Sequence, residues 1–394
     1  MAIKINILPN YFLKKDGTFD KTGAINLCGK IAGVCYAKEG FDHLCDEPIE
    51  KTERRINMTL NNGHHSVYDH IFISFNIKDI PKILAMVINN EKEYTTSEKS
   101  ARYTPIIRSG CITLKEEELY NKWVLIFTDK IKELYGDFYN DSKIKKLAQE
   151  NARYLVTVFM PTEMIYTTSL RQINYIASWM KDYMRECKKD DFSIKLSNAM
   201  EEFIKELERN NVLVDGLMTN DKKRSISLFG KDLDKKEKYF GDIYETIYTS
   251  TFAYLAQAQR HRTLNYKIEL LDNKEYFVPP IIESDSSLVK EWISDIKSVS
   301  NIYPQGEMIR ILESGTYENF ILKCKERLCT AAQLEIMNKT NEILKEYKKS
   351  LEESGNPLSK DIINYTKGAR CTFKDFVCKE KCGFKEGICL SRKI

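Results

Sequence analysis

The segment TFAYLAQAQRHR, residues 251–262, decides how the rest of this chain is interpreted. It is an apolar, helix-like run that ends in three consecutive titratable side chains, Arg260, His261 and Arg262. Neighbouring residues of a helix point about 100° apart, so these three side chains cannot cheaply share one solvent-exposed patch. A helix dipole favours cations at the carboxyl end, and the planar guanidinium of arginine suits phosphate. Two interpretations therefore stay open: a helix C-terminus that carries cations because the helix dipole favours them, and a binding site for an anion.

The surroundings of this segment occur twice in the chain, although few letters match. Residues 87–103 and 257–273 each follow an apolar helix and each lead towards a proline. A polar stretch rich in lysine and aspartate, residues 215–238, forms the best internal boundary. Such repetition favours a duplicated fold. The predicted domains are a first copy over 1–214, a second, shorter copy over 215–350, and a Cys-rich tail over 351–394.

Local patterns indicate both strands and helices. Alternation predicts a strand over 2–8, and β-branched and aromatic residues predict another over 71–77. Residues 91–103 lack helical periodicity and are expected to form a loop. A long amphipathic segment is expected over 240–262. Helices are expected over 21–36, 51–62, 81–89, 117–140, 143–157, 163–187, 193–209, 287–300, 306–313 and 316–349. The predicted class is α+β, with a sheet flanked by long helices in each copy.

The segment GHHSVYDH, residues 63–70, holds three of the five histidines of the chain. A histidine cluster can bind zinc, but nothing nearby in the sequence completes a set of ligands. Together with Arg260-His261-Arg262, this segment resembles the flavin-dependent thymidylate synthase (ThyX) family. That family carries a GHxSxxEH segment, which helps to hold the flavin, and the signature RHRxxSxNxxSxR. The resemblance implies flavin contacts for Ser66, Asp69, Arg171, Arg260, His261 and Arg262.

Neither copy carries the whole signature. The second copy has Asn265 where the family has serine, and it lacks the distal serine and arginine. The first copy has Asn90-Glu91-Lys92 in place of Arg-His-Arg, but it keeps the distal end as Glu98-Lys-Ser100-Ala-Arg102. Ala152-Arg153 and the later run Glu326-Arg327 to Ile336 resemble two further nucleotide-binding motifs, the second of which has Met180 at the matching place in the first copy. The resemblance implies that the nucleotide is bound by Glu98, Ser100, Arg102, Arg153, Gln257 and Arg327.

In the family, active sites form between the subunits of a homotetramer, and the two groups of residues come from different subunits. Here the first copy keeps one group and the second copy keeps the other. The resemblance therefore implies composite active sites between the two copies, and a homodimer that mimics the family tetramer. It also implies transfer of a one-carbon unit from methylenetetrahydrofolate to dUMP, giving dTMP, with FAD reduced by NADPH. Two alternatives stay open: a methylase or hydroxymethylase acting on another pyrimidine nucleotide such as dCMP, and a non-catalytic nucleotide-binding protein.

Composition limits the other classes of function. The 394 residues are 42% hydrophobic and 30% charged, which is typical of a packed globular protein. A net charge of +4, spread along the chain, does not suit a strong nucleic-acid binder. No apolar run reaches the roughly 20 residues that cross a bilayer, and the N-terminus has no apolar signal region. We therefore expect a cytoplasmic protein with no membrane or nucleic-acid partner.

The eleven cysteines are distributed unevenly. Their odd number favours reduced thiols over a disulfide framework. Four of them, Cys371, Cys378, Cys382 and Cys389, form the tail pattern C-x6-C-x3-C-x6-C. Four thiolates match a closed tetrahedral zinc site, although these spacings are wider than usual. The tail predicts zinc, with an iron–sulfur cluster or four unbound thiols as alternatives.

Overall fold

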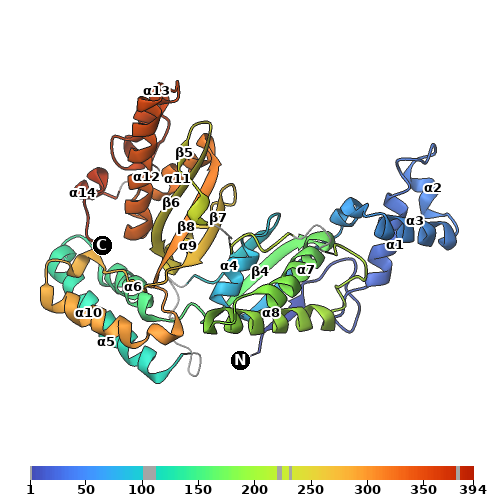
Figure 1. Cartoon of the computed structure of the whole chain (residues 1–394), viewed down its shortest axis with the longest axis horizontal. Coiled ribbons are helices and arrows are strands. Elements are labelled where there is room, and N and C mark those ends of the chain that lie inside the picture. Colours follow the sequence, from blue (N-terminus) through green and yellow to red (C-terminus); the bar gives the residue numbers. More distant parts are fainter. Residues whose placement is uncertain (1, 101–111, 220–223, 230–232, 379–381) are drawn as a thin grey trace. The chain divides into compact units, whose positions relative to one another are not determined.

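The computed structural model describes residues 2–100, 112–219, 224–229, 233–378 and 382–394 (Figure 1). The chain forms two compact units. Unit 1 comprises Met1–Lys99 and Phe159–Ser227, and unit 2 comprises Ser100–Val158 and Leu228–Ile394. Residues 100–158, which the sequence assigned to the first copy, therefore pack in unit 2. Among the described residues, no helix is both long enough and apolar enough to cross a membrane.

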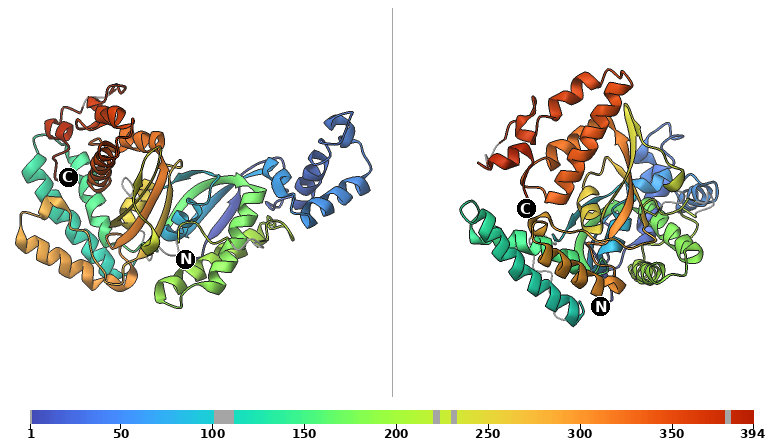
Figure 2. Two further views of the ribbon diagram at one scale, coloured as in Figure 1. Left: turned by 45° about the horizontal axis from the view of Figure 1, so that its top comes forward. Right: turned by 60° about the vertical axis from the view of Figure 1, so that its left-hand side comes forward.

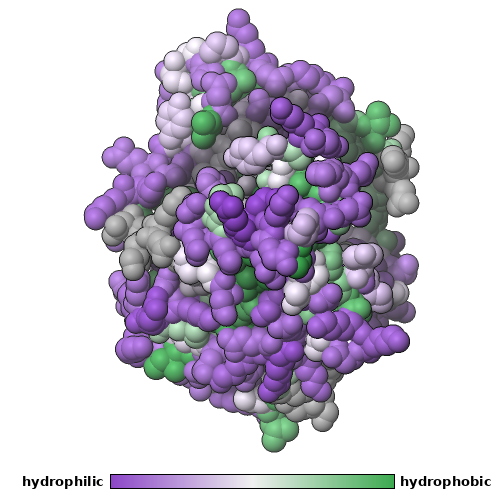
Figure 3. All heavy atoms as spheres, turned by 90° about the vertical axis from the view of Figure 1, so that its right-hand side faces the viewer, coloured by the Kyte–Doolittle hydropathy of each residue, from purple (hydrophilic) through white to green (hydrophobic). Residues whose placement is uncertain are grey.

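Unit 1 contains an antiparallel sheet of four strands in the order β1-β2-β4-β3. Helices α7 and α8 cover one face of this sheet, and α4 follows β2 directly (Figure 2). Three helices near the N-terminus, α1 to α3, lie on the side of unit 1 seen in Figure 3, where the surface is mainly hydrophilic. The elements of unit 1 are β1 (Lys4–Ile7), α1 (Lys21–Ile31), α2 (Phe41–Cys45), α3 (Ile49–Asn61), η1 (His65–His70), β2 (Phe72–Pro81), α4 (Lys82–Ile88), β3 (Thr95–Glu98), β4 (Pro161–Ser169), α7 (Leu170–Glu186) and α8 (Asp191–Arg209).

Unit 2 repeats this order around a second antiparallel sheet, β5-β6-β8-β7. Its main elements are α5 (Leu114–Tyr135), α6 (Asp141–Ala152), η2 (Arg153–Leu155), η3 (Leu233–Lys235), β5 (Tyr239–Phe240), β6 (Ile243–Thr251), α9 (Phe252–Ala258), β7 (Asn265–Leu270), η4 (Pro280–Ile282), α10 (Ser286–Ser298), η5 (Ser300–Ile302), β8 (Met308–Thr316), α11 (Tyr317–Arg327) and α12 (Leu334–Glu353). The tail adds α13 (Ser359–Ile362), η6 (Ile363–Tyr365), η7 (Arg370–Thr372) and α14 (Lys385–Cys389).

The two sheets share one strand order, and the helices that directly follow their strands correspond, which confirms the predicted α+β class and the duplication. In both sheets the second strand in sequence runs straight into a helix of 7 residues, α4 or α9. The next strand, β3 or β7, begins 7 residues after that helix ends (95 − 88 and 265 − 258). The last strand of each sheet, β4 or β8, also passes directly into a helix, α7 or α11. The repeat that was weak in letters is therefore clear in topology.

Several segments expected to be helical form central strands. Residues 163–169 lie in β4, 306–313 lie mostly in β8, and 240–262 divides into β6 and α9. Residues 316–349 break between α11 and α12, and the loop predicted over 91–103 contains β3. In β6 the alternate side chains are buried, as in a strand with one face on the core. Non-local pairing decides such segments, because a short apolar run has no helix or strand identity of its own.

Candidate functional site

The Arg260-His261-Arg262 triplet lies just beyond the end of α9, in the turn that leads to β7. His261 is buried, with 7% of its surface exposed, whereas Arg260 and Arg262 are exposed. Arg327, the last residue of α11, donates from Nε to His261 Nε2 at 2.7 Å. Its Nη2 donates to the carbonyl oxygen of Gln257 at 3.2 Å. The three consecutive side chains thus diverge, and the central one orients an arginine from another helix.

His261 is held in the neutral state. Burial lowers its pKa to about 2, and the positive charges of Arg327 and Lys323 act in the same direction. Since Arg327 Nε donates to Nε2, that nitrogen is the acceptor, and the ring proton is on Nδ1. A neutral acceptor in this position fixes the guanidinium of Arg327 without cancelling its charge.

A second arginine joins this group from η2. Arg153 is 3% exposed and donates from Nη2 to Gln333 Oε1, which also accepts a hydrogen bond from Gln257 Nε2. Gln333 Nε2 in turn donates to the hydroxyl of Tyr154 at 2.6 Å. Arg153 was assigned to the group of the first copy, but it packs in unit 2 because residues 100–158 fold there. Four of the predicted residues, Arg153, Gln257, His261 and Arg327, therefore belong to one hydrogen-bonded region of unit 2.

A buried acceptor of this region has no hydrogen-bond partner within the described part of the chain. Gln257 Oε1 is buried and accepts no hydrogen bond there. Buried acceptors in native proteins are nearly always satisfied, so an unsatisfied one beside two arginines suggests a place for a donor from a ligand. Its neighbours Arg153 and Arg327 would supply charge to an anionic group on the same ligand.

Beneath these side chains unit 2 buries a polar network that the sequence did not reveal. Glu335 accepts four hydrogen bonds, from Tyr154, from Ser250 Oγ and from both the backbone N–H and Oγ1 of Thr251, at 2.7–3.0 Å. The sequence offered one indication, since Glu335 is the last charged residue of the run from Glu326 to Ile336. These bonds anchor the start of α12, beside Gln333, to the end of β6.

A buried ion pair lies in the same unit. Lys323 Nζ and Glu313 Oε2 are 2.6 Å apart, and both side chains are fully buried. Tyr244 and Tyr248 donate to Glu313, and Lys323 also donates to the hydroxyl of Tyr254. Burial alone would lower the pKa of Lys323, but the charges of Glu313 and Tyr254 and the hydrogen bonds to both together outweigh it and raise that pKa. Lys323 lies one helical turn before Arg327 on α11, so the pair fixes the helix that carries the site arginine.

Among the described residues of unit 1, the positions that match His261 and Arg327 carry neither a histidine nor an arginine. Glu91 stands three residues after α4, where His261 stands three after α9, and it is 1% exposed. Met180 replaces Arg327. Burial raises the pKa of Glu91, and hydrogen bonds from Ser227 partly offset this, with Ser227 N donating at 2.5 Å. The guanidinium of Arg224 lies 3.7 Å from Glu91 and covers the ring of Trp179. The chain's own residues 224–227 thus fill this position.

Other predicted residues lie in unit 1. Arg171 Nη1 forms an ion pair with Asp69 at 2.8 Å, and Ser169 Oγ donates to the same carboxylate at 2.6 Å. Both members of the ion pair are about 40% exposed, and Ser66, on the same η1 turn as Asp69, is exposed. These three residues therefore offer a polar, solvent-accessible surface. Among the residues with described positions, the histidines of this segment form no metal cluster.

The predicted nucleotide loop is described only in part. Glu98, at the end of β3, is hydrogen-bonded and ion-paired to Lys82 at the start of α4. Ser100 is the first residue of unit 2 by sequence. Arg102 lies outside the described residues. Lys82 was not foreseen; its apolar surroundings in the sequence gave no indication that it neutralises Glu98.

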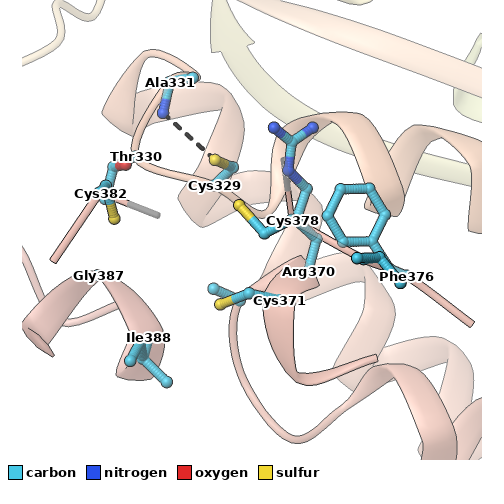
Figure 4. A pocket seen from close by; sticks show the side chains of 12 residues that line it. Cys329, Thr330, Ala331, Arg370, Cys371, Phe376, Cys378, Cys382, Gly387 and Ile388 are labelled. Atoms are coloured by element: carbon cyan, nitrogen blue, oxygen red, sulfur yellow. Dashed lines mark hydrogen bonds between the residues drawn. The ribbon is translucent and has the colours of Figure 1, made fainter. Parts of the chain in front are cut away.

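The Cys-rich tail packs on unit 2 and forms one side of a cavity of about 570 Å³. Three predicted ligands, Cys371, Cys378 and Cys382, line this cavity together with Cys329 from the loop after α11 (Figure 4). Cys389 is exposed and is not among the lining residues. Burial raises the pKa of Cys371, and so do the negative charges of the other three lining cysteines. Within the described ranges, no three His, Cys, Asp or Glu side chains lie close enough together to hold a metal ion.

Fold and site together define a class: a duplicated α+β protein whose second unit gathers arginine and glutamine side chains suited to an anionic ligand. Residues 19–183 match the family model described as thymidylate synthase complementing protein. The resemblance to the flavin-dependent thymidylate synthases is confirmed over this part of the chain, which is less than half of its length.

Individual relatives agree with the family match. A flavin-dependent thymidylate synthase of Pyrococcus furiosus is 22% identical over 168 residues, which are 41% of this chain and 64% of that protein. One from Clostridium tetani is 25% identical over 158 residues, 36% of this chain and 64% of that protein. The chain thus spans less than two thirds of the length of these relatives.

Two solved structures were also similar. The UMP/dUMP methylase PolB of Streptomyces cacaoi, bound to 5-Br dUMP, has a TM-score of 0.33 at 14% identity, covering 53% of this chain and 92% of that chain. Thymidylate synthase X of Helicobacter pylori with FAD and dUMP has a TM-score of 0.30 at 12% identity, covering 55% and 99%. Scores this low support no conclusion about this chain.

Proposed function

We propose that this protein is a flavin-dependent thymidylate synthase, a methyltransferase that converts dUMP to dTMP with methylenetetrahydrofolate and NADPH as co-substrates. The observation that carries the proposal is the buried group Arg153, Gln257, His261 and Arg327 in unit 2. Two cationic guanidinium groups and an unsatisfied amide oxygen suit a ligand that has both an anionic phosphate and an N–H donor, which is the chemistry of a uracil nucleotide.

Each residue has a distinct role in this proposal. Arg153 and Arg327 bind and orient the nucleotide, and their charges favour negative charge that develops on the pyrimidine ring. His261 is a positioning residue, because its neutral Nε2 fixes the guanidinium of Arg327. Gln257 holds Gln333 through Nε2 and keeps Oε1 for a donor from the ligand. The nucleotide loop, with Glu98, Ser100 and Arg102, completes the binding group by resemblance to the family.

The residues assigned to the cofactor fit FAD in chemical type. Arg260 and Arg262 are exposed cations beside the buried His261, which suits a diphosphate group. The Asp69–Arg171 pair with Ser66 supplies further exposed polar groups. When bound, FAD would supply the hydride, and the protein would supply binding, orientation and electrostatics. No protein nucleophile is required, so the cysteines need no part in the reaction.

Two measurements test the proposal. The purified chain should carry a flavin absorbance band, and it should release label from ring-labelled dUMP only when methylenetetrahydrofolate and NADPH are both present. A colourless protein that binds dUMP would instead support the non-catalytic alternative. Arg102→Ala should abolish dUMP binding and leave the flavin bound; lost flavin with normal dUMP affinity would contradict the assignment.

A different acceptor is the second candidate. The ion pair between Lys82 and Glu98 engages a carboxylate that the resemblance assigns to the nucleotide, and Asn265 stands where the family has serine. Both departures favour a methylase or hydroxymethylase acting on another pyrimidine nucleotide. Competition between dUMP, dCMP and UMP for the purified protein, followed by product analysis, distinguishes the two reactions.

The proposed assembly is a homodimer in which two chains provide the four copies of the family tetramer. The two groups of residues would then combine into composite active sites. Complementation tests this: a mixture of an Arg102→Ala chain and an Arg327→Met chain should recover activity if the groups act in different chains. If the mixture stays inactive while each variant folds and dimerises, the groups act within one chain.

A further inference from the structure

The tail is fastened to the loop that joins α11 to α12. This loop, residues 328–333, begins directly after Arg327 and ends at Gln333, the N-cap of α12. Arg370 N donates to the carbonyl oxygen of Leu328 at 2.7 Å. Arg392, which is 5% exposed, donates from Nη2 to the carbonyl oxygen of Ala332 at 2.6 Å. The tail therefore braces a loop whose two ends carry site residues.

Four cysteines line one cavity at this junction. Cys329 comes from the loop itself, Cys371 from η7, and Cys378 and Cys382 from the tail that follows. Figure 4 shows their side chains around one cavity, with Arg370 and Phe376 on one side and Gly387 and Ile388 on another. No other part of the described chain collects so many thiols in one place.

A backbone N–H group and a cationic side chain lie beside these thiols. Ala331 N–H points at Cys329 Sγ, with 3.5 Å between nitrogen and sulfur. Arg370 lines the same cavity and contributes a positive charge. Four thiolates around one divalent ion carry a net charge of −2, so a nearby cation offsets the cost of assembling them.

We propose that Cys329, Cys371, Cys378 and Cys382 bind one Zn²⁺ ion, which locks the Cys-rich tail onto the loop between Arg327 and Gln333. Four sulfur ligands and no further donor are typical of closed structural zinc sites. The thiols release their protons to solvent as the metal binds, and no electrons are transferred.

These four proposed zinc ligands differ from the four that the spacing of the tail cysteines predicts. Cys389 ends α14 and does not line the cavity, whereas Cys371 and Cys382, which are also exposed, do. Cys329 precedes the tail cysteines by at least 42 residues (371 − 329), so no short motif could have included it. The four sulfur atoms have to move together, because a tetrahedral zinc site places sulfurs about 3.8 Å apart at bonds of about 2.3 Å. Rotation about χ1 of each cysteine would bring the sulfur atoms together as the metal binds, as expected where metal binding completes folding.

Metal content of the full-length chain tests the proposal. Purified protein should contain about one zinc per chain and no stoichiometric iron. Cys329→Ser should lose the zinc, or bind it at least tenfold more weakly in competition with a chromophoric chelator. Cys389→Ser is the matched control and should retain it. The proposal is overturned if Cys389→Ser loses zinc while Cys329→Ser keeps it, if iron replaces zinc, or if the wild-type chain fails to bind added Zn²⁺.

A second measurement needs no variant, and therefore does not depend on whether Cys329→Ser folds. The native protein is alkylated with one reagent, treated with a chelator, and alkylated with a second reagent before peptide mass analysis. Cys329, Cys371, Cys378 and Cys382 should carry the second label, and Cys389 the first. A first label on Cys329 contradicts the proposal. Neither test uses flavin or dUMP, so the outcome is independent of the proposed function.

Discussion

Replacement of Arg327 by methionine, the residue that unit 1 has at the matching place, is the sharpest test of the site. Arg327 donates to His261 at 2.7 Å and to the Gln257 carbonyl at 3.2 Å, so its guanidinium is already oriented before a ligand arrives. A hydrogen bond between charged groups contributes about 1.5–3 kcal/mol. Loss of one such contact to the nucleotide should weaken dUMP binding roughly 10- to 150-fold.

Calorimetric titration with dUMP measures this change. Lys345→Met, an exposed lysine on α12, is the control and should bind dUMP as the wild type does. Arg327→Lys keeps the charge but loses the planar fork, so its affinity should fall between those of wild type and Arg327→Met. The reasoning is refuted if Arg327→Met folds, as judged by circular dichroism, and binds dUMP with unchanged affinity.

Three further predictions follow from the buried groups. Because burial lowers the pKa of His261, this residue is protonated only in the unfolded chain as the pH falls, and the free energy of unfolding should drop by about 2 kcal/mol from pH 8 to pH 5. Urea unfolding of His261→Gln should not show this drop. An equal pH dependence in wild type and variant would contradict the prediction. Lys323→Met should lower the free energy of unfolding by about 3–5 kcal/mol, since it leaves Glu313 charged and buried, and a change below 1 kcal/mol would argue against the ion pair. In unit 1, Arg224 and Ser227 contact Glu91 and occupy the space where a ligand would bind. Equilibrium dialysis should therefore give about one dUMP per chain, and a value of two would show that unit 1 also binds dUMP.

The sequence by itself determined the local chemistry of the protein. The Arg260-His261-Arg262 triplet and the segment 63–70 were recognisable because turn and helix-end residues are set by near neighbours in the chain. The equal spacing after the two apolar helices also predicted the duplication, and β7 repeats β3 at that spacing. The exposed pair Asp69 and Arg171 was found by the same kind of short pattern.

Only the tertiary structure decided what distant segments do together. β4 is a strand because it pairs with β2 across 80–97 residues of sequence (161 − 81 and 169 − 72). β6 and β8 are strands because they pair with each other across 57–73 residues (308 − 251 and 316 − 243), which no local periodicity encodes. Arg153, which the sequence placed with the first copy, packs in unit 2. Lys323 reaches Glu313, ten residues earlier, because β8 passes directly into α11. Cys329 lines the cavity with the tail thiols, and Cys389 does not. Which side chains line a cavity depends on their direction and distance in the folded chain, whereas a spacing pattern contains only their order in the sequence.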